Sequence, residues 1–62
     1  MKLTNQIVDK MIAEGREVVM TDNYGDTFSA TVTHRNKRTF YAFDQSGHEM
    51  AIERSSIQTW AF

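Results

Sequence analysis

The densest group of basic side chains lies in one short segment, His34-Arg35-Asn36-Lys37-Arg38. Arg35, Lys37 and Arg38 are three of the seven lysine and arginine residues in the chain. Guanidinium groups bind phosphate through paired hydrogen bonds, so Arg35 and Arg38 are candidates for an anion site. The alternative is a solvated turn between two strands, in which these charges only keep the strand ends in water.

Other reactive side chains form no recognisable catalytic or metal-binding pattern. The serines have no histidine and carboxylate placed to activate them, and the acidic residues match neither a catalytic carboxylate pair nor a calcium loop. Cysteine is absent, and the two histidines, His34 and His48, match no ligand spacing. We therefore expect a protein that is not an enzyme and that needs no metal or cofactor.

Length and charge limit the remaining classes. A chain of 62 residues forms one domain, expected over residues 1–62, and a domain this small has a marginal core. The net charge of −1 argues against broad electrostatic binding to a nucleic-acid duplex, although it permits a local basic patch. No apolar run is long enough to span a membrane, and the first residues lack a signal-peptide core, so the cytoplasm is the expected location.

One helix is expected over about residues 5–14. Thr4 can cap its first turn, and Gly15 suits the left-handed position that ends a helix. The apolar residues that share one helical stripe are Leu3, Ile7, Val8, Met11 and Ile12. This stripe is expected to cover one end of the remaining structure, and docking into a partner is the alternative.

Five short strands are expected within residues 16–60. Glu17–Thr21 is the first of them, and Thr27–Thr33 alternates apolar and hydroxyl-bearing residues. Three more strands, Thr39–Phe43, Glu49–Arg54 and Ser56–Trp60, follow at hairpin spacing. The expected core residues of the sheet are Val18, Met20, Phe28, Ala30, Val32, Phe40, Ala42, Met50, Ile52 and Ile57. The fold class predicted is α+β, mainly β, with a helix before a strongly bent antiparallel sheet that closes into a small SH3-like barrel.

Two aromatic residues have the opposite parity to this core. Tyr41 and Phe43 alternate with Phe40 and Ala42, so they either pack under the helix or lie on an outer face. On an outer face, an aromatic ring could stack on a nucleic-acid base or take part in a subunit contact.

The order of elements resembles the Sm-like family, and within it the bacterial Hfq RNA chaperones. The motifs that carry the resemblance are Gly25-x-x-Phe28-x-Ala30-x-Val32 and Met50-x-Ile52-x4-Ile57. These motifs consist of apolar positions and one glycine, and the resemblance as a whole covers nearly the whole chain. The resemblance implies the Sm fold, RNA as a partner and assembly into a ring.

Several positions depart from the Hfq pattern. The Tyr-Lys-His signature of that family corresponds to Glu53-Arg54-Ser55, so only Arg54 keeps the basic character. Arg38 stands where the family has a stacking aromatic, Thr4 replaces a helix glutamine, and Ala30 replaces a strand glycine. The segment from Gly47 to Trp60 also resembles the Rof (YaeO) inhibitors of transcription termination factor Rho, which act by binding a protein.

Two functions follow as hypotheses. The first is a non-catalytic regulator that binds RNA through Arg35, Lys37, Arg38 and Arg54, with Tyr41 stacking a base. The second is a small inhibitor or adaptor that binds a host protein of the transcription or other nucleic-acid machinery. We expect a homo-oligomer joined through the edge strands, because a small core gains stability from association. A monomer would instead favour the second function.

Overall fold

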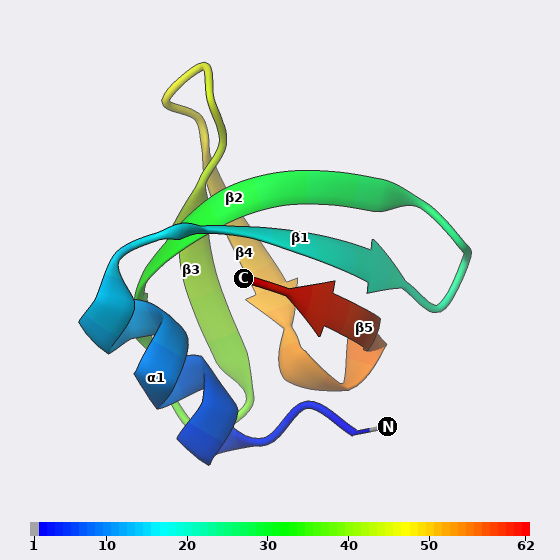
Figure 1. Ribbon diagram of the computed structural model, residues 1–62. Coiled ribbons are helices and arrows are strands. Elements are labelled where there is room, and N and C mark those ends of the chain that lie inside the picture. Colours follow the sequence, from blue (N-terminus) through cyan, green and yellow to red (C-terminus); the bar gives the residue numbers. More distant parts are fainter. Residues whose placement is uncertain (1) are drawn as a thin grey trace.

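The computed structural model describes residues 2–62 as one helix followed by a strongly curved antiparallel sheet (Figure 1). A 3-10 turn, Arg54–Ser56, joins the last two strands. The elements are α1 (Asn5–Glu14), β1 (Glu17–Asp22), β2 (Thr27–Arg35), β3 (Thr39–Phe43), β4 (Glu49–Glu53) and β5 (Ile57–Ala61). The predicted fold class and element order are confirmed, and β5 extends one residue beyond the predicted range.

Helix α1 begins and ends where its capping residues predict. The Thr4 hydroxyl accepts a hydrogen bond from the Ile7 N–H at 3.3 Å, which satisfies an amide of the first turn. Gly15 adopts φ of 62°, and its N–H donates to the Met11 carbonyl at 3.1 Å. The helix packs against β2 through its apolar stripe, and Val8 and Met11 are fully buried there.

The sheet is open, which differs from the predicted closed barrel. Its strand order is β4-β3-β2-β1-β5, so β4 and β5 are both edge strands. The turn Arg54–Ser56 carries the chain from the β3 side of the sheet to the β1 side, and each edge strand therefore pairs with only one neighbour. Register shifts after Thr21 and Val32 mark irregular pairing of the kind that increases twist.

The core lies on the concave face of the sheet and beneath α1. Its buried members are Leu3, Val8, Met11, Val18, Met20, Ala30, Val32, Phe40, Ala42, Ile52 and Ile57. Phe28 and Met50, which were predicted in the core, are only half-buried and pack against it. Phe28 lies near the start of β2 and Met50 on the edge strand β4, so fewer neighbours cover them.

Within residues 2–62 no helix has the length and apolar character needed to cross a membrane.

Candidate functional site

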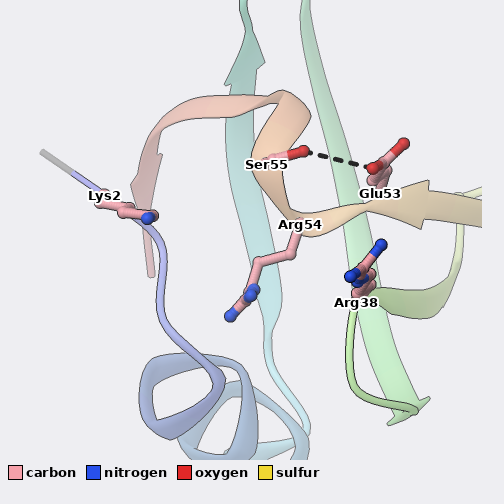
Figure 2. Close-up of a pocket in the computed structure, with 5 residues that line it drawn as sticks. All are labelled: Lys2, Arg38, Glu53, Arg54 and Ser55. Atoms are coloured by element: carbon pink, nitrogen blue, oxygen red, sulfur yellow. Dashed lines mark hydrogen bonds between the residues drawn. The ribbon is translucent and has the colours of Figure 1, made fainter.

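Three segments that are distant in sequence line a cavity of about 250 Å³ (Figure 2). Lys2 comes from the chain before α1, and Arg38 comes from the turn between β2 and β3. The end of β4 and the 3-10 turn supply Glu53, Arg54 and Ser55. We call this set of five residues the basic pocket.

Backbone hydrogen bonds hold the two arginines of the basic pocket together. The Arg54 N–H donates to the Arg38 carbonyl at 2.8 Å, next to the point where Thr39 on β3 pairs with Glu53 on β4. The Ser56 hydroxyl donates to the Glu53 carbonyl at 2.6 Å and fixes the turn that follows. The positions of Arg38 and Arg54 relative to each other are therefore set by the sheet.

The turn that carries Arg38 is ordered by an asparagine. The Asn36 side-chain oxygen accepts hydrogen bonds from the N–H groups of Arg38 at 3.2 Å and Thr39 at 2.9 Å. The side-chain amide of Asn5, at the start of α1, donates to the Lys37 carbonyl at 3.2 Å. These contacts tie the turn to the helix, so Arg38 projects from a backbone that is already fixed.

Lys2 reaches the basic pocket because its neighbour is anchored. Leu3 is buried in the core, with 2% of its surface exposed, and this holds the preceding residue near the start of α1. Figure 2 shows the Lys2 ammonium and the Arg54 guanidinium directed toward the same hollow. No motif in the sequence pointed to Lys2.

The lining of the basic pocket is mainly cationic. Lys2, Arg38 and Arg54 contribute three positive side chains, and Glu53 contributes one negative one. Within residues 2–62, none of these four side chains forms an ion pair. Unpaired cations that converge on one hollow are suited to binding an anion, above all phosphate.

Arg35 has a different environment from the one predicted for an anion-binding residue. Its guanidinium donates to both oxygens of Asp9 on α1, with Nε–Oδ1 of 2.6 Å and a second contact of 2.9 Å, and also to the Asn36 carbonyl at 3.2 Å. These hydrogen bonds lower the pKa of Asp9 and raise the pKa of Arg35. Arg35 therefore fastens the end of β2 to α1 and does not line the basic pocket.

Lys37 and Tyr41 also lie outside the basic pocket. Lys37 is exposed at the β2–β3 turn. Tyr41 is half-buried on the outer face of the sheet, and its ring stacks on His34 of β2 with centroids 4.5 Å apart and planes 14° apart. One face of the tyrosine ring is thus already covered.

Two further surface features lie away from the basic pocket. A shallower hollow of about 390 Å³ is lined by Asp44 and by residues of β2 and the β3–β4 turn, and its lining contains no cation. Tyr24, in the turn between β1 and β2, is 91% exposed, and Asp22 and Asp26 flank it.

Comparisons with known proteins support the fold. No family model and no curated protein matches the sequence. The structure is similar to a crystal structure described as the pleiotropic translational regulator Hfq, with a TM-score of 0.82 and 17% sequence identity over 94% of this chain and 95% of that one. The chain therefore has an Sm-like fold of the Hfq type, as the sequence resemblance predicted.

Proposed function

We propose that this protein is a non-catalytic, RNA-binding regulator of the Sm/Hfq-like type. The observation that carries the proposal is the convergence of Lys2, Arg38 and Arg54 on one cavity. These are three of the seven basic residues of a chain whose net charge is −1. Binding to a polyanion must therefore be local, and the basic pocket is where the positive charge is concentrated.

The structure suggests how such a small basic pocket could serve a long polymer. Strands β4 and β5 each have one unpaired side, and backbone N–H and C=O groups on such an edge can pair with a second copy of the chain. We propose that copies associate through these edges into a closed homo-oligomer. Repetition of the basic pocket around a symmetry axis would multiply the phosphate contacts made to one RNA.

The alternative function is that of an inhibitor or adaptor that binds a protein of the transcription or other nucleic-acid machinery. The observation in its favour is the turn between β1 and β2, where Tyr24 is almost fully exposed between two aspartates. Exposed tyrosines are enriched at protein interfaces, and the aspartates would complement a basic partner.

The proposal can be tested by titrating short U-rich and A-rich RNAs at two salt concentrations, with sedimentation equilibrium on the same samples. We expect binding that weakens as salt rises, because displaced counterions compete for the phosphates. We also expect a mass well above the 7.2 kDa of one chain. Absence of RNA binding near physiological salt, together with specific capture of one basic protein that is lost in Tyr24→Ala, would favour the alternative.

A further inference from the structure

Glu53 is the unexpected member of the basic pocket. It is the last residue of β4, its side chain is exposed, and it lines the cavity together with Lys2, Arg38 and Arg54. Across residues 2–62 its carboxylate forms no ion pair, and its one side-chain hydrogen bond is a long one of 3.4 Å from the Ser55 hydroxyl to Oε1 (Figure 2). The carboxylate therefore keeps most of its capacity to accept hydrogen bonds.

A carboxylate inside a phosphate-binding pocket has an energetic cost. It repels the phosphate that the three cations attract, and it offers only acceptors at neutral pH. It can contribute favourably to binding only if the ligand brings a neutral hydrogen-bond donor close to the phosphate. In RNA, the two kinds of neutral donor are the ribose 2′-hydroxyl and the N–H groups of the bases.

The lining of the basic pocket favours the sugar over the base. None of its five residues is aromatic, so no ring is available on which a base could stack. Its volume of about 250 Å³ lies below the usual range of about 300–1,000 Å³ for pockets that enclose a whole organic ligand. A phosphate with its attached ribose suits this size and this lining.

We infer that Glu53 makes the basic pocket selective for RNA over DNA by accepting a hydrogen bond from the 2′-hydroxyl of a ribose whose phosphate is held by Lys2, Arg38 and Arg54. This inference rests on the proposed function and names the chemical group that the same site reads. The recognised unit is the ribose-phosphate backbone, independent of the base.

The test compares three probes of equal length: oligouridylate, oligodeoxyuridylate and 2′-O-methyl oligouridylate. The wild-type protein should bind the first about tenfold or more tightly than the other two, which is the effect of one hydrogen bond to a charged group. In Glu53→Ala, all three probes should bind with similar affinity. The two oligomers without a 2′-hydroxyl should also bind more tightly than before, because a repulsive charge has been removed.

Glu49→Ala is the matched control. Glu49 is an exposed glutamate on the same strand, and it does not line the basic pocket. Its replacement removes the same charge and should leave the preference for ribose unchanged. Thermal unfolding and sedimentation of each variant verify that fold and assembly are retained.

The outcomes separate the inference from the proposed function. Wild-type protein that binds RNA and DNA equally, or a ribose preference that survives in Glu53→Ala, overturns the inference and leaves RNA binding intact. A preference that follows base identity when oligoadenylate replaces oligouridylate assigns Glu53 to a base and also overturns it. If no probe binds near physiological salt, the proposed function fails and the inference fails with it.

Discussion

Reversing the charge of Arg38 tests the basic pocket most directly. A phosphate bound there would lie at ~4 Å from the guanidinium, where two unit charges interact by about 1 kcal/mol even at the dielectric constant of water. Arg38→Glu replaces one attraction by one repulsion, so the loss is at least about 2 kcal/mol, or roughly 30-fold in affinity. Partial exclusion of water from the cavity would enlarge this loss.

The fold should tolerate this substitution. Arg38 is exposed, and the hydrogen bonds that the structure gives it, to Arg54 and to Asn36, use its backbone carbonyl and N–H. The unfolding free energy should therefore change by no more than about 0.5 kcal/mol. Fluorescence anisotropy with a labelled RNA measures the affinity, and thermal unfolding followed by circular dichroism measures the stability.

Lys37→Glu provides the matched comparison for Arg38→Glu. It makes the same charge change one residue away, on an exposed side chain that does not line the basic pocket. Because salt in the surrounding water screens this exposed charge, we expect the affinity for RNA to fall by about threefold or less at physiological salt. If both variants lose the same RNA affinity, the turn contributes only diffuse positive charge. In that case, or if Arg38→Glu keeps full affinity, the assignment of the basic pocket is wrong.

Two further predictions concern the fold. Asp9→Asn should lower the melting temperature at neutral pH by removing the charge that binds Arg35. The pKa of Asp9 is lowered in the folded state, so its ionised carboxylate stabilises the fold at any pH above the unfolded pKa. That stabilisation is lost as the pH falls through the folded pKa. The melting temperatures of the two proteins should therefore stay apart above about pH 4 and converge below it. Val32→Asp should prevent folding, because Val32 is 1% exposed and a carboxylate there would be buried among apolar side chains. Val32→Ala should instead leave a folded but less stable protein. Circular dichroism distinguishes the two outcomes, and a folded Val32→Asp protein would contradict the assigned core.

The helix and the strands could be predicted from the sequence because the residues that determine them are close together in the chain. The alternation in Thr27–Thr33 fixes which face of β2 is buried, and the capping residues Thr4 and Gly15 fix the two ends of α1. Whether the sheet closes into a barrel or stays open could not be predicted in the same way. It depends on where β4 and β5 lie relative to each other, which is set by the three-residue turn and by irregular pairing beside Asp22.

The candidate site was accessible only in part, since proximity in sequence and proximity in space differ here. Arg35 and Arg38 lie in one basic segment, yet Arg35 ends β2 facing α1 and Arg38 faces the end of β4. No pattern in the sequence distinguishes them, because the distinction depends on Asp9, a residue of the helix. Glu53 and Ser55 flank Arg54 in the segment that the Hfq resemblance had marked, so that segment was the available signal for both.

The substitutions relative to the Hfq pattern change what this site can recognise. An aromatic ring reads a base by its flat face, which selects stacking partners, whereas the lining here offers charge and hydrogen-bond groups. An arginine at position 38 would bind any phosphate of the backbone, and a glutamate at position 53 would accept a hydrogen bond that DNA cannot donate from its sugar. If both residues act in this way, the protein distinguishes RNA from DNA but is tolerant of sequence. Affinity should then differ little between U-rich and A-rich RNAs, and a strong preference for one of them would require a second, base-reading surface elsewhere on the assembly.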